Sequence, residues 1–278
     1  MDVPGIDPLA AAALASERRF VLALGGYALE VPGGTLVIHE KIPSPRFNYV
    51  VVERVAPQRQ AAFFERALDH YFQRAIRPRF RCFGAPAEHV ARALHRFSFR
   101  PLPEPRTVLV AGARPPAAPD PRYAVGPASD REIDQVVGFW TVESERPELR
   151  TSVDVAMHHP SPDESLVPVL AKDGSMPVAA ALLFRSGEAA GIHLVTTRSD
   201  ARGQGAASAL VQAVRADGTF PPGTQWSIVA DTPRLVGRLT TLGFSPAAAF
   251  TEYELPRDAE LALPPPGPPT PARWRPPR

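Results

Sequence analysis

The fold is decided by the stretch Val195-Thr196-Thr197-Arg198-Ser199-Asp200-Ala201-Arg202-Gly203-Gln204-Gly205-Ala206-Ala207-Ser208. An apolar run, residues 191–197, ends there in a short polar loop, and a helical pattern begins after the loop. Gly203 and Gly205 let the backbone turn tightly and approach a ligand closely, because neither residue has a Cβ. The stretch therefore predicts a strand, a tight turn and a helix.

The start of this predicted helix has the properties of an anion site. Ala206 and Ala207 keep the first turn bare, so the amide groups that have no partner within the helix are open to a ligand. These amides, the positive end of the helix dipole and Arg202 together predict a site for a pyrophosphate. The loop is not a Walker loop, which needs a Lys and a Ser or Thr after its last Gly, and it is not a clear G-x-G-x-x-G motif.

The segment Arg202-Gly203-Gln204-Gly205-Ala206-Ala207 resembles the Arg/Gln-x-x-Gly-x-Gly/Ala motif of the GNAT (GCN5-related) N-acetyltransferases, in which the loop holds the pyrophosphate of acetyl-CoA. Leu242-Gly243-Phe244 is similar to the Gly-Phe that follows the last helix of this family. The alternative interpretation of the loop is an ordinary glycine-rich turn. The resemblance implies that acetyl-CoA is bound by Val195, Thr196, Thr197, Arg202, Gly203, Gln204, Gly205, Ala206, Ala207 and Ser208.

Composition excludes several classes of protein. The 278 residues predict one or two domains, and the apolar fraction of 44% is ordinary for a globular protein. A net charge of +2 gives no broad basic field, so no nucleic-acid partner is expected. The single cysteine, Cys82, excludes an internal disulfide and a cysteine-rich zinc site and fits a reducing cytosol.

The sequence also predicts no membrane partner. No apolar stretch approaches the roughly twenty residues that span a bilayer. Residues 1–19 place an Ala-rich run before Arg18-Arg19, whereas a signal peptide places its basic residues first. We therefore expect a cytoplasmic protein.

Proline divides the chain into segments. A Pro-rich and stiff linker, residues 113–121, separates residues 1–112 from residues 122–257. Residues 258–278 are too rich in proline for helix or sheet and are expected to be a disordered tail. A docking peptide built on Trp274 and the arginines of the tail is the alternative.

Periodicity predicts the elements of both domains. In the first, we expect helices at Pro8–Arg19, Pro57–Phe72 and Ala87–Phe97 and strands at Val21–Leu24, Ala28–Val31, Thr35–His39, Tyr49–Val55, Arg79–Phe83 and Thr107–Ala111. In the second, we expect in order Tyr123–Val125 (strand), Ser129–Thr141 (helix), Ser152–His158 (helix), Leu166–Ala171, Val178–Arg185 and Ala189–Thr197 (strands), Gly205–Ala216 (helix), Gln225–Ala230 (strand), Pro233–Leu242 (helix) and Ala247–Leu255 (strand). The second order matches the GNAT order from end to end. We therefore expect an α/β (α+β) protein with the GNAT fold, a mixed and mostly antiparallel sheet flanked by helices.

The first domain partly repeats the element order of the second. It also ends in helix, strand, helix and strand, but it lacks an Arg-x-x-Gly-x-Gly/Ala loop. Two-module acetyltransferases with a degenerate first module look similar, so we interpret residues 1–112 as a degenerate GNAT-like lobe that shapes the acceptor pocket. Pro45-Arg46-Phe47-Asn48 then lies near its sheet edge, or is a plain loop before a strand.

The resemblance implies acyl transfer from acetyl-CoA to an amine, with a hydrogen bond to the carbonyl from the backbone of Val195 to Thr197. The amine must be neutral to attack a thioester, so the site needs a proton acceptor near neutral pH. His193 is the best candidate, because an imidazole titrates in this range; a half-buried strand histidine is the alternative. Two positions depart from the family: Leu239 stands where a Tyr often protonates the thiolate, and Ala189 stands where a Glu is often found.

Acceptor choice in this family is set by the helices after the first strand. Glu143 and Glu145 are candidates to bind a cationic amine, with Trp140 as an aromatic wall. Exposed acids at a helix end explain both glutamates equally well. His158-His159 in a Pro-rich loop do not converge as metal ligands do, so no metal is expected.

Two functional hypotheses follow. In the first, the protein is an acetyl-CoA-dependent N-acetyltransferase acting on an amine of a small molecule or peptide. In the second, it is a catalytically silent GNAT-fold module that binds CoA as a sensor or scaffold, which the missing Tyr and Glu favour. A binding protein that takes no CoA leaves the bare helix start at Gly205 unexplained. The sequence defines neither the acceptor nor the oligomeric state.

Overall fold

The computed structural model describes residues 6–84, 86–112, 116–143, 151–153, 163–216, 220–221 and 223–256, with only the backbone described for residues 141–143. The helical elements are α1 Pro8–Ala23, η1 Pro57–Arg59, α2 Gln60–Phe72, α3 Glu88–Arg96, α4 Asp130–Glu143, η2 Ser199–Ala201, α6 Ala206–Ala216 and α7 Pro233–Thr241. The strands are β1 Tyr27–Val31, β2 Gly34–Ile38, β3 Tyr49–Val52, β4 Arg79–Phe83, β5 Arg100–Pro101, β6 Arg106–Ala111, β7 Tyr123–Pro127, β8 Glu164–Asp173, β9 Met176–Ser186, β10 Ala189–Thr197, β11 Gln225–Ala230 and β12 Phe244–Glu254.

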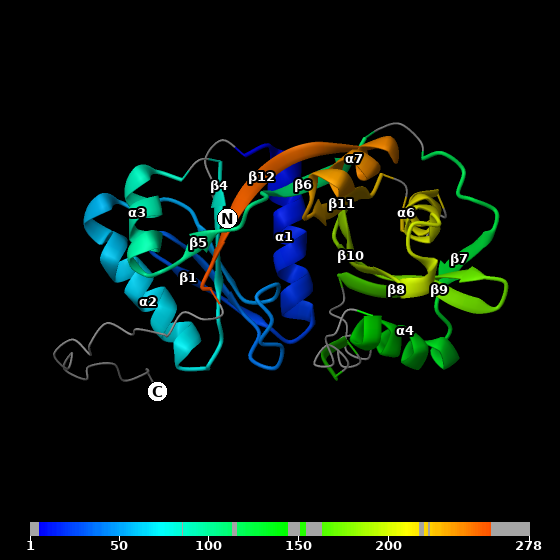
Figure 1. Ribbon diagram of the computed structural model, residues 1–278, viewed down its shortest axis with the longest axis horizontal. Helices are drawn as coiled ribbons and strands as arrows, with labels where there is room; N and C mark the ends of the chain where they lie inside the picture. The colour runs from blue at the N-terminus through cyan, green and yellow to red at the C-terminus, as the bar shows by residue number, and fades with distance from the viewer. Residues whose placement is uncertain are drawn as a thin grey trace.

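One continuous sheet runs through both halves of the chain. Its strand order is β1-β2-β3-β4-β12-β6-β11-β10-β9-β8-β7, and the short β5 pairs with β12. Helices α2 and α3 lie at one end of the molecule and α4 and α6 at the other, with α1 standing between them (Figure 1). We call the part around β1 to β4 the first lobe and the part around β7 to β11 the second lobe. The mixed, mostly antiparallel sheet flanked by helices confirms the predicted fold class.

The lobes exchange strands at their junction, which sequence patterning did not predict. Strand β6, expected to close the first domain, pairs with β11 and β12 of the second half. Strand β12 pairs at its other end with β4, where Phe250 lies opposite Phe83. Figure 1 shows β12 arching across both lobes. The predicted boundary at residues 113–121 is therefore not a break in the sheet.

Helix α1 is longer than its sequence pattern indicated. The side chain of Asp7 accepts a hydrogen bond from the Leu9 amide at 2.8 Å, and Pro8 occupies the first turn, where its missing N–H costs nothing. The strand expected at Val21–Leu24 is wrong, because these residues continue the helix to Ala23. Val21 and Leu24 extend its buried face and lie in a core cluster with residues of both lobes, so packing keeps the apolar run helical.

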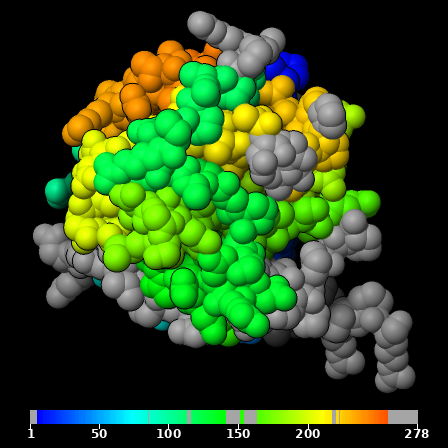
Figure 2. Space-filling model, turned by 90° about the vertical axis from the view of Figure 1, so that its right-hand side faces the viewer, coloured from blue at the N-terminus to red at the C-terminus, as the bar shows by residue number. Residues whose placement is uncertain are grey.

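The elements of the second lobe follow the prediction closely. Strand β10 has the expected bounds, and α6 begins one residue later than expected. At the start of α4 the Glu132 carboxylate accepts from the amide and hydroxyl of Ser129, and the amide contact is one half of a capping box. Viewed from this end, the second half of the chain forms the surface (Figure 2). Of the helix expected at Ser152–His158, only residues 152–153 lie within the described residues, and they are helical; the tail 258–278 lies outside them entirely.

Candidate functional site

The loop after β10 has the backbone that its glycines predicted. Gly203 and Gly205 have φ angles of 78° and 97°, which side chains with a Cβ rarely adopt. A Cβ added at either glycine meets nothing within 4 Å, so the backbone angle and not crowding requires glycine. The Gly205 carbonyl accepts from the Ala209 amide at 2.9 Å and so begins α6. The first amides of α6 have no partner within the helix.

Side chains fix this loop against the sheet. The Tyr123 hydroxyl, from β7, donates to the Gln204 carbonyl at 2.9 Å. The side-chain amide of Gln204 donates from Nε2 to the Asp200 carbonyl at 2.8 Å, and Arg202 Nε donates to the Thr197 carbonyl at 3.3 Å. The loop is therefore held in shape before any ligand arrives, which reduces the entropy lost on binding.

A second cation lies at the start of α6 and was missed in the sequence. Arg238 of α7 donates from Nε to the Ser208 hydroxyl at 2.9 Å. Its guanidinium is thus placed beside the same helix end that Arg202 approaches through the loop. No local pattern indicates this role, because Arg238 is 30 residues from Ser208 in the chain and only the packing of α7 brings them together.

Strands β10 and β11 separate beside this loop. They are parallel neighbours over three residue pairs only, from Ala189–Gln225 to Gly191–Ser227. Beyond that point β10 bulges, with an irregular register between His193 and Thr196 and a φ of 50° at Leu194. Thr196 and Thr197 pair with β9 on one side, so their other edge faces the opening between β10 and β11. We call this opening the β10–β11 gap.

His193 lies at the closed end of the gap but does not titrate near neutral pH, contrary to expectation. Its ring stacks on Phe20 of α1, with centroids 4.0 Å apart and planes 9° from parallel, and it covers Gly191. Burial, with a smaller effect of the Arg46 charge, lowers the pKa of His193 to about 3. The imidazole is therefore neutral and weakly basic, and its Nε2 has no hydrogen-bond partner among the described residues.

The predicted acceptor residues are placed less favourably. Trp140 is 0% exposed and packs in the core with Phe20 and Phe184, so its ring presents no open aromatic wall. Glu143 is the last residue of α4 and its side chain is not described, while Glu145 lies outside the described residues. Leu239, the buried residue of α7, lies in the core, and its apolar side chain cannot donate a proton.

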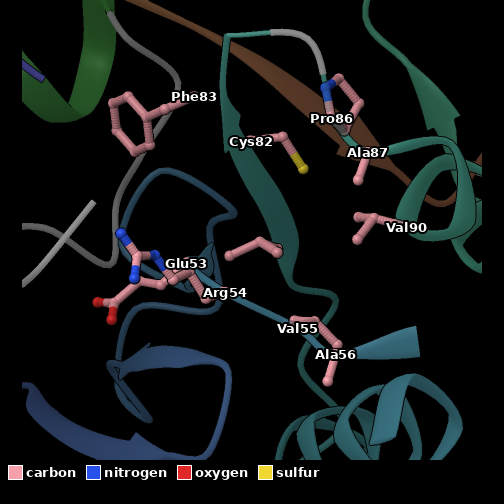
Figure 3. Close-up of a pocket in the computed structure, with 10 residues that line it drawn as sticks. Glu53, Arg54, Val55, Ala56, Cys82, Phe83, Pro86, Ala87 and Val90 are labelled. Carbon is pink, nitrogen blue, oxygen red and sulfur yellow. The ribbon is translucent and has the colours of Figure 1, made fainter. Parts of the chain in front are cut away.

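Two pockets lie away from the loop. The larger, about 430 Å³, belongs to the first lobe and opens past the ends of β3 and β4 (Figure 3). The smaller, about 100 Å³, lies between the lobes and is lined by Glu17, Arg46, Arg79, Arg81, Arg106, Val229, Asp231, Phe250 and Glu252. The smaller pocket includes one residue of β11, Val229, and neither pocket is lined by a residue of β10. We call the larger one the first-lobe pocket.

Comparison with solved structures identifies the fold. The structure is similar to a GCN5-related N-acetyltransferase from Kribbella flavida, with a TM-score of 0.63 at 16% identity over 88% of this chain and 95% of that chain. The chain has the GNAT fold. A GCN5-related N-acetyltransferase from Sphaerobacter thermophilus matches with a TM-score of 0.56 at 14% identity over 91% of this chain and 97% of that chain.

A tandem GNAT protein from the clavulanic acid biosynthesis pathway matches with a TM-score of 0.52 at 12% identity, over 81% of this chain and 79% of that chain. This similarity extends over both lobes. No protein-family model and no curated protein matches the sequence.

Two further kinds of site were sought. Within the described ranges, no group of three or more His, Cys, Asp or Glu side chains is placed to hold a metal ion; His158 and His159 lie outside those ranges. None of the described helices has the length and apolar character needed to cross a bilayer.

Proposed function

We propose that the protein is an acetyl-CoA-dependent N-acetyltransferase that acts on an amine of a small molecule or peptide. The proposal rests on one observation: the open amides at the start of α6 lie where β10 ends, beside the β10–β11 gap. Amides at a helix start bind phosphate oxygens, and Arg202 and Arg238 add positive charge at this point. The GNAT-fold neighbours support the same activity.

The chemistry that fits the gap is direct acyl transfer. The nitrogen of a neutral amine bonds to the thioester carbonyl carbon, the carbon–sulfur bond breaks, and the sulfur leaves as a thiolate. The nitrogen loses one proton and the thiolate gains one, so an amide and a free thiol result. Backbone groups of Val195, Thr196 and Thr197 at the open edge of β10 are suited to bind the carbonyl oxygen.

A second candidate function is a silent GNAT-fold module that binds CoA as a sensor or scaffold. It is favoured by the burial of Leu239 and by the low basicity of His193, which leave these two positions without a proton donor or acceptor for the reaction. The two functions share the coenzyme site and differ only in turnover. Both are consistent with a protein in the cytoplasm.

Coenzyme binding is tested by calorimetry and by thermal shift with CoA. We expect the wild-type protein to bind CoA and Arg202→Glu to bind at least about tenfold more weakly, because a carboxylate replaces a guanidinium beside the phosphates. Arg92→Glu, an exposed position on α3, is the matched charge reversal and should leave binding unchanged. Unchanged binding in Arg202→Glu would remove Arg202 from the site.

Turnover is tested with acetyl-CoA and a panel of amines, by following release of the free thiol. Thiol release that depends on the amine, with the acetylated amine detected by mass spectrometry, supports the transferase. Tight binding of CoA without any amine-dependent release supports the silent module instead.

A further inference from the structure

The first-lobe pocket is not used by the proposed acetyl transfer. Its lining residues all lie within residues 52–90, so none belongs to the coenzyme loop, to β10 or to β11. It opens where the parallel pair of β3 and β4 ends, at Val52 and Cys82. Its volume of about 430 Å³ is in the range of small-ligand sites, roughly 300–1,000 Å³. The pocket is therefore large enough for a ligand of its own.

One wall of the pocket is apolar and is fixed by the protein itself. The ring of His89, in the first turn of α3, donates from Nε2 to the Val55 carbonyl at 2.8 Å and so joins the turn after β3 to α3. The side chains of Val52, Val55, Cys82 and Val90 belong to one core cluster and are buried. Burial raises the pKa of the Cys82 thiol to about 12, so this side chain is a neutral part of the wall. A preformed wall limits the entropy lost on binding.

Two opposite charges lie across the pocket from this wall. Figure 3 shows Glu53 and Arg54 on one side of the pocket and Val55, Ala87 and Val90 on the other. Arg54 is exposed and Glu53 is half-buried. In the described part of the chain, neither forms an ion pair, with the other or with any further residue. The pocket therefore combines an apolar wall with a carboxylate and a guanidinium that are both available to a ligand.

The surroundings of Glu53 favour a cation beside it. Its Oε1 lies 3.2 Å from the Thr35 hydroxyl, which also donates to Glu30 at 2.7 Å. A hydroxyl has one proton, so the shorter contact with Glu30 takes it, and the two carboxylates lie near the same oxygen. Arg18 pairs with Glu30 at 3.0 Å, whereas no cation pairs with Glu53 among the described residues. An ammonium group beside Glu53 would offset the repulsion between the two carboxylates.

Arg54 supplies the opposite charge on the same side of the pocket. A guanidinium group binds a carboxylate through two parallel N–H donors. A ligand that contacts both Glu53 and Arg54 must carry an ammonium group and a carboxylate close together, because the two residues are neighbours in the chain. The rest of such a ligand meets the apolar wall. A free α-amino acid with an apolar side chain has this distribution of charge.

We propose that the first-lobe pocket binds a free α-amino acid with an apolar side chain. The carboxylate of the ligand bonds to Arg54, its ammonium group bonds to Glu53, and its side chain lies against Val52, Val55 and Val90. The ligand contacts the turn after β3 as well as α3, so it stabilises the first lobe against unfolding. The site is separate from the coenzyme loop, and the inference does not depend on acetyl transfer.

Calorimetry with matched small molecules tests the ligand class on the wild-type protein. L-Leucine is the probe. L-Leucinamide lacks its carboxylate, 4-methylpentanoate lacks its ammonium group, and glycine lacks its apolar side chain. We expect leucine to bind at least about tenfold more tightly than each analogue, because each analogue loses one of the three contacts. Absence of leucine binding, or analogues that bind as tightly as leucine, would overturn the inference and leave the proposed transferase untouched.

Variants at the rim and the single cysteine locate the ligand. Arg54→Gln and Glu53→Gln should each weaken leucine binding about tenfold and leave CoA binding unchanged. Arg59→Gln and Glu65→Gln, at exposed positions of η1 and α2, are the matched controls and should bind leucine as the wild type does. Leucine at ten times its Kd should slow the labelling of Cys82 by a thiol reagent about tenfold. Wild-type leucine affinity in both rim variants, or unchanged labelling of Cys82, would place leucine elsewhere and refute the site.

Discussion

The two lobes share an order of elements but differ in how their parallel strands pair. In each, a strand leads through a short 3-10 turn into a helix and then into a parallel neighbouring strand. In the second lobe, β10 and β11 pair for three residues and then separate. In the first lobe, β3 and β4 pair over four residues, from Tyr49–Arg79 to Val52–Cys82, with no register shift. The two pairs therefore differ in how they end: β10 bulges as it separates from β11, whereas β3 and β4 stay in register to Val52–Cys82 and the larger pocket opens past their ends.

The turns that follow the first strand of each pair also differ. The second-lobe loop contains two glycines with positive φ and presents bare amides. In the first lobe, η1 begins with Pro57, which has no amide hydrogen, and α2 follows directly with Arg59 in a helical conformation at its N-cap. A parallel strand pair before a helix is thus not sufficient for a coenzyme site. We infer that only the second lobe binds the coenzyme.

The largest expected effect concerns the junction of the lobes. Glu252→Gln should reduce the free energy of unfolding by roughly 3–5 kcal/mol, because three guanidinium groups near a low-polarity interior lose their shared carboxylate. Glu254→Gln removes a half-exposed partner of Arg79 and should cost less than about 1 kcal/mol. Urea denaturation measures both. Two separate unfolding transitions in wild type would show that the lobes are independent.

The same carboxylate predicts a pH dependence. Burial by itself would raise the pKa of Glu252, but Arg81, Arg79 and Arg106 outweigh it and hold the pKa below its ordinary value. A carboxyl whose folded pKa is depressed stabilises the fold above its unfolded pKa, near 4.3, and this stabilisation is lost as the pH falls through the folded value. The stability difference between wild type and Glu252→Gln should therefore narrow below about pH 4, as followed by urea midpoints across pH.

A smaller effect is expected where β10 begins to separate from β11. A Cβ at Gly191 would overlap His193 Nε2, so Gly191→Ala must displace the imidazole from beside Phe20. We expect a loss of roughly 1–3 kcal/mol, typical of overpacking. In the double variant Gly191→Ala/His193→Ala the clash is absent, and a double-mutant cycle should show the two changes to be coupled. Strict additivity would show that the ring can move without cost.

A methyl group added at the turn of the second lobe should have a larger effect than a change at the turn of the first lobe. Gly205→Ala forces a φ of 97° on a residue with a Cβ and should cost roughly 1–2 kcal/mol while weakening CoA binding. Gln58→Ala, at the corresponding turn of the first lobe, should change neither quantity appreciably. Calorimetry and thermal unfolding distinguish the two variants. Equal effects on CoA binding would contradict the assignment of the coenzyme to the second lobe.

The smallest expected effect concerns Cys82, because CoA should not change the rate at which a thiol reagent labels it. Cys82 lines the first-lobe pocket (Figure 3), and burial raises the pKa of its thiol to about 12. Labelling by a thiol reagent at pH 8 should be slow in the native protein, because little thiolate is present. Saturating CoA should not slow it further. Protection of Cys82 by CoA would place the coenzyme in the first lobe.

Local pattern predicted what depends on local chemistry. The bounds of β10 follow from an apolar run, and the turn at Gly203 and Gly205 follows from residues that tolerate positive φ. Long-range pairing was not predictable, because the hydrogen bonds that join β6 to β11 leave no periodic trace in either strand. The same reason hid Arg238, which reaches Ser208 at the start of α6 only through the packing of α7. The burial of Trp140 was also not predictable, because it lies in a core cluster that draws residues from distant segments of the chain.

The exchanged strand β12 also affects how the protein is made. Phe250 to Tyr253 complete the sheet at Cys82 and its neighbours, about 170 residues earlier in the chain. The first lobe is synthesised long before this strand emerges from the ribosome. The backbone groups on one edge of β4 therefore have no paired strand during most of translation. A chain that ends before β12 should accordingly leave this edge of the first lobe unpaired and should depend more on chaperones than the full chain.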